Sequence, residues 1–384
     1  MIRPGRCVRT AGDRCGTKAR GAARWSVRPG RSTWPERGGG ATPVGRLFPP
    51  LDNTTSVANY PVTPQAAQTA VEEAAERPYE RAVKHLAGQH GIRLGKELLE
   101  NLSKTVGTYW LQQDQQRLTA AQAEQAAPAE RLAAEQCVIL GDGVMVHTEG
   151  DWHEARVGTV RSRGPDGMVH KSSIVRLADV QAFGEDLWRH ACEWGYRSAG
   201  QVAFVADGGH WLWGVAARHF QRALLITDFW HVCENVCACA KVFWGEGTAE
   251  TQQWSQAICD RLRAGQVSEA LRQVEALNPR SSPARREAKH ALVTYLRNNQ
   301  ERMDYPRYES LGLPIGSGEV EAQCKSLVQA RCKQAGMRWS RDGAESLLRV
   351  RCAVQDGRYE QEFGHWPGNL SAWQAHRKWL DRAA

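Results

Sequence analysis

The order of apolar runs between residues 136 and 228 limits the fold of this chain more than any other feature. Runs rich in β-branched and aromatic residues predict strands, and amphipathic runs of helical period predict helices between them. Short polar connections between the first three runs favour an antiparallel meander. In chain order we expect strands at 136–147, 152–163 and 170–178, a helix at 179–196, a strand at 201–207, a helix at 209–220 and a strand at 223–228.

This β-β-β-α-β-α-β order predicts an α/β domain with a mixed five-stranded sheet. The right-handed crossover rule returns the fourth strand parallel to the first, and the fifth strand then lies outside the fourth. The order fits an RNase H-like fold. Helical periods replace strand signals after residue 230, so we expect a large all-helical insertion at 231–312. A closing helix then begins at the glycine-rich segment 316–318.

Carboxylates stand on three of the predicted strands: Asp142 on the first, Asp207 ending the fourth and Asp228 ending the fifth. A buried carboxylate costs free energy unless a cation lies beside it. With strands about 4.8 Å apart, Asp142 and Asp207 would be neighbours and Asp228 would lie roughly 10 Å from Asp142. Hard oxygen ligands favour Mg²⁺ or Mn²⁺, and two such ions suit phosphoryl transfer. Glu319 and Glu321 are both candidates for a third carboxylate, and solvated strand ends are the alternative interpretation.

Two further patterns follow the fifth strand. The spacing Asp228-x-x-His231 suits a pair that orders the metal site or contacts DNA, but also an ordinary helix cap followed by a packed histidine. Three cysteines, Cys233, Cys237 and Cys239, stand close to His231. A metal cluster is conceivable there, and helix packing is the interpretation that we favour because free cysteine buries readily.

The charge of the chain is concentrated at its beginning. Residues 1–47 hold 11 Lys/Arg and 2 Asp/Glu, which leaves 50 − 11 = 39 basic and 42 − 2 = 40 acidic residues elsewhere, a net charge of −1. A DNA-binding surface on the rest of the chain must therefore be a local patch. Residues 1–47 have few aliphatic residues and are expected to be disordered, or to result from a misassigned or frameshifted start. No apolar run could span a bilayer, so we expect no membrane and a cytoplasmic location.

Helical signals dominate residues 48–135. Thr63 and Pro64 suit an N-cap and the first position of a helix. Residues 80–107 predict two short helices joined by a turn at Gly91, which is typical of a DNA-binding helix-turn-helix but also of ordinary helical hairpins. An Ala/Gln-rich helical stretch at 111–135 then leads into the first strand.

Several segments together resemble the transposases of the ISKra family of bacterial insertion sequences. The resemblance covers residues 46–365 and is most specific from Asn298 to Ser340. This family looks related to the Mutator-like DDE transposases, which have an RNase H-like catalytic domain with a helical insertion. They carry a Cys/Asp-x-x-His signature after the second catalytic Asp, and here that spacing is 228 − 207 = 21. The other matching segments are GDGVMVHTEGDWHEARVGTV, FVADGGHWLWGVAARHF, ITDFWHVCENV and GEGTAETQQW.

The resemblance implies that Asp142, Asp207 and Glu321 are the catalytic residues and hold two Mg²⁺ (or Mn²⁺) ions. Asp228 is the alternative to Asp207 as the second ligand, and the adjacency of the first and fourth strands favours Asp207. Glu321 stands in the motif G-S-G-x-V-E, and Asp228 and His231 fill the signature. The resemblance implies a cysteine-containing, zinc-binding segment before residues 48–52. The chain departs from the family there, since Cys7 and Cys15 stand alone in an Arg/Gly-rich stretch. Basic and aromatic residues after the closing glutamate are candidates for DNA contacts, with a solvated helix face as the alternative. These residues are Lys325, Arg331, Lys333, Arg338, Trp339 and Arg341.

The sequence therefore predicts a DNA transposase that cuts at terminal inverted repeats and joins the freed 3′-OH ends to target DNA. An inactive or repurposed DNA-binding protein and an RNase H-like structure-specific nuclease are the alternatives. Resemblance implies a homodimer or larger assembly on DNA, in the bacterial cytoplasm at the nucleoid. The expected organisation is a basic segment at 1–47, a helical region at 48–135, the first part of the core at 136–230, the insertion at 231–312, and the closing helix and tail at 313–384.

Overall fold

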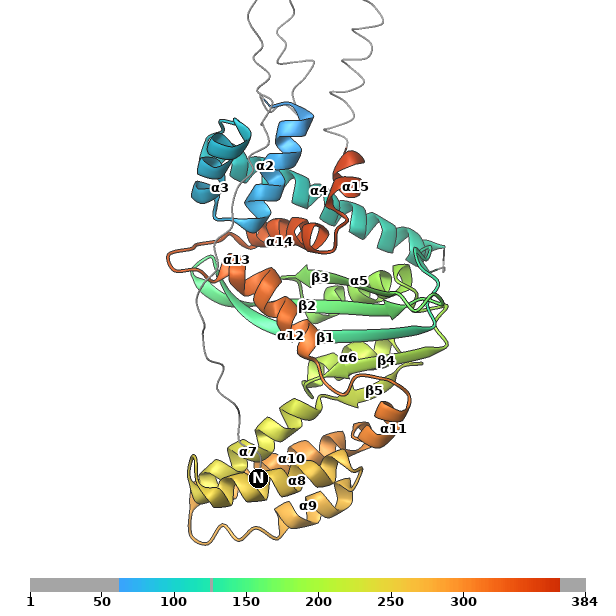
Figure 1. Cartoon of the computed structure of the whole chain (residues 1–384), viewed down its shortest axis with the longest axis vertical. Helices are drawn as coiled ribbons and strands as arrows, with labels where there is room; N and C mark the ends of the chain where they lie inside the picture. Colours follow the sequence, from blue (N-terminus) through green and yellow to red (C-terminus); the bar gives the residue numbers. More distant parts are fainter. Residues whose placement is uncertain (1–61, 125–126, 367–384) are drawn as a thin grey trace, which may run out of the picture. The chain divides into compact units, whose positions relative to one another are not determined.

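A five-stranded mixed sheet lies at the core of the described part of the chain (Figure 1). The structure is a computed structural model that describes residues 62–124 and 127–366, so the predictions for residues 1–47 lie outside the described residues. The strands are β1 (Gln136–Thr148), β2 (Asp151–Arg163), β3 (Val169–Arg176), β4 (Gln201–Ala206) and β5 (Leu224–Thr227). Their order is β3-β2-β1-β4-β5, antiparallel from β1 to β3 and parallel from β1 to β5. The predicted α/β class, mixed sheet and strand order are confirmed.

Helices cover both faces of the sheet. One face carries α5 (Val180–Glu193) and α6 (His210–His219), which share an apolar cluster with the odd-numbered residues of β1 and the even-numbered residues of β4. Asp179 caps α5 by accepting a hydrogen bond of 2.8 Å from the backbone N–H of Ala182. The opposite face packs against a helical segment made of α12 (Gly318–Gln323), the π-helix η3 (Cys324–Gln329) and α13 (Ala330–Cys332).

Helices fill the chain between β5 and α12, where helical periods predict them. α7 (Phe229–Trp244) leads away from the end of β5, and the next helices pack against it and against each other. In Figure 1 this group, coloured yellow to orange, lies beyond the β5 edge of the sheet. The remaining elements of the group are α8 (Ala249–Arg263), α9 (Val267–Glu275), α10 (Pro283–Asn299), η2 (Gln300–Arg302) and α11 (Tyr305–Ser310).

The N-terminal helices begin as predicted and differ further on. Thr63 caps the first of them, its hydroxyl accepting a hydrogen bond of 3.3 Å from the N–H of Ala66. The chain turns at Gly91, where φ is 67°. The next helix, however, runs for 28 residues, joins the second predicted short helix to the Ala/Gln-rich stretch and ends before that stretch is complete. These elements are α2 (Pro64–Glu76), α3 (Tyr79–His85), the π-helix η1 (Leu86–His90) and α4 (Lys96–Ala123).

Close packing explains why α4 continues through Gly107. A Cβ atom at this position would lie 2.1 Å from the carbonyl oxygen of Ser346 on α14 (Arg341–Gln355). Gly107 therefore allows two helices to touch and does not end one. α4 also shares a buried cluster with α2, α14 and α15 (Tyr359–Gly364), so helices from both ends of the described chain form one core.

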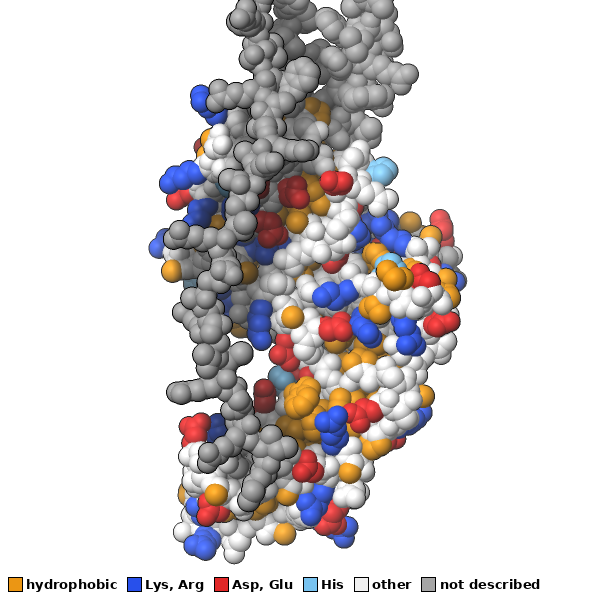
Figure 2. All heavy atoms as spheres, in the orientation of Figure 1, with side chains coloured by type: hydrophobic (Ala, Val, Ile, Leu, Met, Phe, Trp, Pro, Cys, Tyr) orange, Lys and Arg blue, Asp and Glu red, His pale blue; other side chains and the backbone are white. Residues whose placement is uncertain are grey.

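Charged side chains of both signs are interspersed over the face shown in Figure 2. This distribution agrees with the nearly neutral net charge of the chain outside residues 1–47. Among the described residues, no helix is both long enough and apolar enough to cross a bilayer.

Candidate active site

Three aspartates continue the register of the parallel strands and fall in one row. Partners on β1 and β4 are offset by 205 − 140 = 65 residues, so Asp142 continues this register opposite Asp207. Partners on β4 and β5 are offset by 227 − 206 = 21 residues, which sets Asp207 opposite Asp228. Sequence reasoning placed these residues on neighbouring strands, and the register aligns them.

The three aspartates also share one face of the sheet. Side chains two positions apart in a strand point to the same face. The residues two positions before each aspartate all belong to the apolar cluster that packs under α12 and η3. The carboxylates therefore face the helix that carries Glu321. Those apolar residues are Leu140, Val205 and Ile226.

Asp142 is half-buried and lies within the electrostatic reach of two other acids. Its Oδ1 accepts a hydrogen bond of 2.7 Å from the N–H of Gly143, and its Oδ2 accepts one of 3.3 Å from the Cys324 thiol. Burial raises the pKa of Asp142, and the negative charges of Asp207 and Glu321 raise it further. The side chain that bonds Asp142 stands on η3, one turn after Glu321, and so joins the sheet to the closing helix.

Asp207 lies on a turn that is held by α10. Its Oδ1 accepts a hydrogen bond of 2.8 Å from the N–H of Gly209, and its backbone oxygen accepts one of 2.8 Å from the Tyr295 hydroxyl. Gly208, with φ of 103°, sits so close to Tyr295 that a Cβ would lie 2.8 Å from the ring. Burial raises the pKa of Tyr295, and the charge of Asp207 raises it further, so the phenol stays a hydrogen-bond donor.

Asp228 is fully buried and uses both oxygens to bind the protein. Its Oδ1 accepts hydrogen bonds of 2.6 Å and 3.1 Å from the N–H groups of Trp230 and His231, which caps α7. Its Oδ2 accepts a hydrogen bond of 2.6 Å from the N–H of Ser317 and another from the Ser317 hydroxyl. Asp228 thereby ties the end of β5 to the start of α12.

Gly316 completes this junction. A Cβ on Gly316 would lie 2.7 Å from Cδ1 of Trp230, so a side chain there would displace the loop before α12 or the Trp230 ring. The Ser317 hydroxyl also lies 3.3 Å from Oε1 of Glu321. The position of Glu321 is therefore determined through Ser317 by the buried carboxylate of Asp228.

The structure groups the predicted site residues in two sets. Ligand atoms of Asp228, His231 and Glu321 all lie within 4.8 Å of one another and could hold a metal ion, and Asp142 and Asp207 lie outside this group. The second set is the electrostatically coupled trio of Asp142, Asp207 and Glu321. Glu321 belongs to both sets and is the point at which they meet.

The donor chemistry of these residues fits a hard divalent cation. Mg²⁺ and Mn²⁺ prefer carboxylate oxygens, and the clustered acids repel one another without a cation. The oxygens of Asp228 are taken up by four protein donors, which suits it to positioning rather than to ligation. Asp142, Asp207 and Glu321 are the acids that remain to bind an ion. The alternative candidate, Glu319, pairs with Arg161 at 3.2 Å and points to β2.

The residues predicted to contact DNA divide into exposed and buried side chains. Lys325, Lys333 and Arg338 are exposed. Arg331 differs from the prediction, because it is 1% exposed and its Nε donates a hydrogen bond of 3.1 Å to the carbonyl of Ala74. Its position on the apolar stripe of the helix, three residues after a buried valine, explains this burial. It is therefore not a surface contact for a phosphate in this arrangement.

Trp339 is anchored to the sheet and to Arg331. Its backbone oxygen accepts a hydrogen bond of 2.9 Å from the N–H of Glu149, at the turn between β1 and β2. The guanidinium of Arg331 lies 4.9 Å from the ring centres of both Trp339 and Tyr79. Part of the indole surface of Trp339 is thus covered by protein. Arg341 is another predicted DNA contact, and its Nε donates a hydrogen bond of 2.8 Å to the carbonyl of Leu177.

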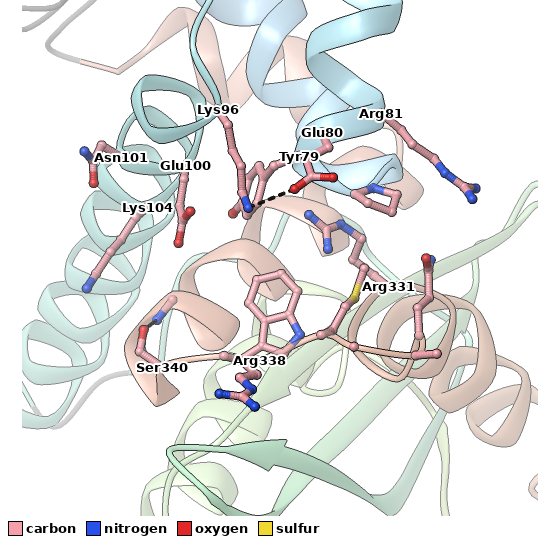
Figure 3. Close-up of a pocket in the computed structure, with 17 residues that line it drawn as sticks. Tyr79, Glu80, Arg81, Lys96, Glu100, Asn101, Lys104, Arg331, Arg338 and Ser340 are labelled. Atoms are coloured by element: carbon pink, nitrogen blue, oxygen red, sulfur yellow. Dashed lines mark hydrogen bonds and ion pairs between the residues drawn. The ribbon is translucent and has the colours of Figure 1, made fainter.

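A cavity of about 490 Å³ with mostly basic charged lining lies between α3, α4 and the segment 334–340 (Figure 3). We call it the basic cavity. In the part of the chain that the structure describes, both terminal nitrogens of Arg331 are buried there without a hydrogen-bond partner. Lys96 pairs with Glu80 at 3.2 Å across it. Its charged lining residues are Arg81, Lys96, Lys104, Arg331 and Arg338 against Glu80 and Glu100.

The three cysteines of α7 differ in burial: Cys239 is buried, whereas Cys233 and Cys237 are partly exposed. Cys239 is buried in the apolar cluster of α7 to α10. Among the described residues, Cys233, Cys237 and Cys239 belong to no group of three possible metal ligands.

Sequence reasoning missed the residues that position the acids. Ser317 and Gly316 stood in the recognised glycine-rich motif, but only as the start of a helix. Tyr295 and Cys324 gave no signal beyond apolar periodicity. Comparison with known proteins adds no assignment to this arrangement: no protein-family model matches the chain, and no curated protein matches it.

Proposed function

We propose that this chain is a DDE-type DNA transposase of the ISKra family of bacterial insertion sequences. The observation that carries the proposal is the row of Asp142, Asp207 and Asp228 on the sheet face that Glu321 approaches. The strand order supports an RNase H-like core, in which the helices of 231–312 would be an insertion. The segments that resemble the family contain all of these residues.

The chain's own residues would prepare the site for phosphoryl transfer. Asp142, Asp207 and Glu321 would hold two Mg²⁺ (or Mn²⁺) ions, which when bound activate the attacking oxygen and stabilise the leaving one. Asp228 positions Glu321 through Ser317 and so keeps the third carboxylate over the strands. The repulsion from Asp207 and Glu321, which helps to raise the pKa of Asp142, would give the site an affinity for cations.

DNA would lie along the closing helix and its following loop. Lys325, Lys333 and Arg338 are exposed and would contact backbone phosphates, which position the duplex without reading sequence. The basic cavity would accept a further phosphate through its exposed basic side chains Arg81, Lys104 and Arg338. The enzyme would cut at terminal inverted repeats and join the 3′-OH ends to target DNA, as a homodimer or larger assembly at the bacterial nucleoid.

Cleavage of DNA bearing the element's ends tests the proposal. We expect the full-length chain to cleave such DNA with Mg²⁺ and not with a chelator. Asp142→Asn, Asp207→Asn and Glu321→Gln should each reduce cleavage by at least about 10³-fold, on the scale of losing an electrostatic catalytic group. Binding of end DNA, measured by gel shift, should persist in all three variants.

Glu319→Gln is the matched control, since it removes a carboxylate from the same helix that pairs with Arg161. It should cleave at the wild-type rate. Full activity of Glu321→Gln, or inactivity of Glu319→Gln in a folded protein, would contradict the assignment.

One observation favours a DNA-binding protein without cleavage as the second candidate. Asp142 and Asp228 both have hydrogen-bond donors from the closing segment, so the acids are satisfied without an ion. Specific end binding with no Mg²⁺-dependent cleavage would support that function. A structure-specific nuclease would cleave without producing strand-transfer joints.

A further inference from the structure

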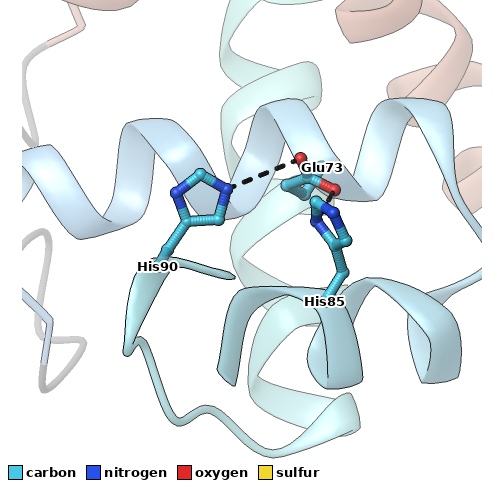
Figure 4. Close-up of side chains that lie close together, drawn as sticks. All are labelled: Glu73, His85 and His90. Atoms are coloured by element: carbon cyan, nitrogen blue, oxygen red, sulfur yellow. Dashed lines mark ion pairs between the residues drawn. The ribbon is translucent and has the colours of Figure 1, made fainter. Parts of the chain in front are cut away.

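Two imidazoles converge on one carboxylate among the N-terminal helices (Figure 4). Glu73 projects from α2, His85 ends α3 and His90 ends η1. Nδ1 of His85 lies 3.0 Å from Oε2 of Glu73, and Nε2 of His90 lies 3.9 Å from Oε1. We propose that these three residues bind a divalent transition-metal ion, Zn²⁺ by their chemistry, and thereby cross-link α2 to α3 and η1.

The separations suit a tetrahedral ion. Zinc binds imidazole nitrogen and carboxylate oxygen at about 2.0–2.1 Å, so neighbouring ligands in a tetrahedron lie about 3.3 Å apart. The measured separation between Oε1 of Glu73 and Nε2 of His90 is 3.9 Å, and one ligand atom from each of the three residues lies within 4.8 Å of the others. Small rotations of the three side chains would place their ligand atoms at three corners of a coordination tetrahedron, and a water molecule would occupy the fourth.

The π-helix brings the two histidines together. Five residues along an α-helix with 3.6 residues per turn leave two side chains about 140° apart. In a π-helix the i→i+5 hydrogen bonds stack such residues on one side, and these segments frequently mark functional sites. η1 spans Leu86–His90, directly after His85. The π-helical turn η1 therefore brings the imidazole rings of His85 and His90 to the same side, with their centres 5.8 Å apart.

An orphaned nitrogen indicates a missing partner. Among the described residues, Nδ1 of His85 is buried and has no hydrogen bond of acceptable geometry, although Glu73 is close. Buried polar atoms in native proteins normally have a partner. Arg77 pairs with Oε2 of Glu73, which leaves Oε1 to bind an ion. The side chains are 15% (Glu73), 34% (His85) and 39% (His90) exposed, so an ion can enter from solvent.

The packing beneath the site gives a cross-link a physical role. Three of the five buried side chains in the cluster between α2, α3, η1 and α4 are alanines, which bury little apolar surface: Ala70, Ala74 and Ala82, beside Leu86 and Leu99. Metal binding to a folded site adds its free energy to folding. A bound ion would hold α3, which contributes Tyr79 and Glu80 to the basic cavity, in place on α2. The inference does not rest on the proposed function.

Calorimetric titration of the full chain with Zn²⁺, after chelation and with Mg²⁺ present, tests the site. We expect His85→Gln and His90→Gln each to weaken Zn²⁺ binding by at least about 10- to 100-fold, the scale on which even outer-shell changes act. Zn²⁺ should raise the Tm of the wild type and leave the Tm of these variants unchanged. His365→Gln is the control, because this exposed histidine lies just after α15 and its Nδ1 bonds the carbonyl of Gln361, far from Glu73 in the sequence.

Other results would overturn the proposal. Loss of Zn²⁺ binding in His231→Gln but not in His90→Gln would place the ion at the candidate active site. Thiolate charge-transfer absorption on substitution with Co²⁺ would show that cysteines bind it. Absence of Zn²⁺ binding by the wild type would remove the site altogether. Mg²⁺-dependent cleavage by His90→Gln, measured in parallel, reports on the proposed function separately.

Discussion

Ionisation of Asp142 lowers the free energy of unfolding of the protein without a bound cation. Burial and the charges of Asp207 and Glu321 raise its pKa, so the folded chain holds a proton there more tightly than the unfolded chain. Stability linked to this group is therefore greatest at low pH, and it falls as pH rises from the unfolded pKa of about 3.9 through the raised folded one. Above that raised pKa the carboxylate is charged and destabilises the fold until a cation binds.

Asp142→Asn should consequently raise the Tm of the metal-free protein at neutral pH, by on the order of 1–2 °C. The amide oxygen can still accept the hydrogen bond from Gly143, and the repulsion is gone. Thermal unfolding in a chelator measures this. Mg²⁺ should then raise the Tm of the wild type more than that of the variant. A lower Tm for Asp142→Asn in the chelator would show that its hydrogen bonds outweigh the repulsion.

Residue positions along strands were predictable, and contacts between distant loops were not. The alignment of Asp142 with Asp207 follows from strand period and crossover handedness, which are local or topological rules. The bond between Asp228 and Ser317 spans 89 residues and depends on how α7 and α12 pack, which no local pattern encodes. Arg331 could have been assigned to the interior, since it continues the stripe of buried residues along its helix.

At the scale of elements, the junction of α7 and α12 depends on a glycine. Gly316→Ala would introduce a Cβ that lies 2.7 Å from Trp230 and so displace the loop that carries Ser317. We expect a loss of about 1–3 kcal/mol in stability, typical of overpacking. We also expect a larger loss of cleavage than of end binding, because Glu321 is moved. Denaturant unfolding and single-turnover cleavage measure the two effects.

Gly318→Ala is the matched control for that change. Gly318 stands in the same motif at the first position of α12, and a Cβ there meets no atom within 4 Å. Both stability and cleavage should stay near wild type. Equal damage by both substitutions would mean that backbone freedom of the motif, and not contact with Trp230, is what matters.

Element types were predictable where the apolar period is uninterrupted. The helical character of residues 231–312 was predictable for that reason. The period does not reveal that α4 passes through Gly107, because the residue's role is set by α14, which is distant in the sequence. Nor does it distinguish the π-helical turns η1 and η3 from α-helix, since these depend on the hydrogen bonds that tertiary packing selects.

At the scale of the molecule, a buried ionic network joins the N-terminal helices to the sheet and to the C-terminal helices. Asp114 on α4 is 5% exposed, and its Oδ2 lies 2.6 Å from Nε of Arg349 on α14. Arg189 on α5 lies 3.7 Å from Oδ1. Burial alone would raise the pKa of Asp114, but the guanidiniums of Arg349 and Arg189 hold it well below its usual range.

Asp114→Asn should therefore destabilise the whole chain by about 3–5 kcal/mol, because it leaves buried guanidinium charge uncompensated. In the wild type the stabilisation from Asp114 is fully present above the unfolded pKa of about 3.9 and is lost as pH falls toward the depressed folded value. Acid should thus lower the Tm of the wild type more steeply than that of the variant. Glu246→Gln, in an exposed pair with Lys241, is the control and should leave the Tm unchanged. If the Tm of the wild type and that of Asp114→Asn fell equally with decreasing pH, the network would not link the two ends of the described chain.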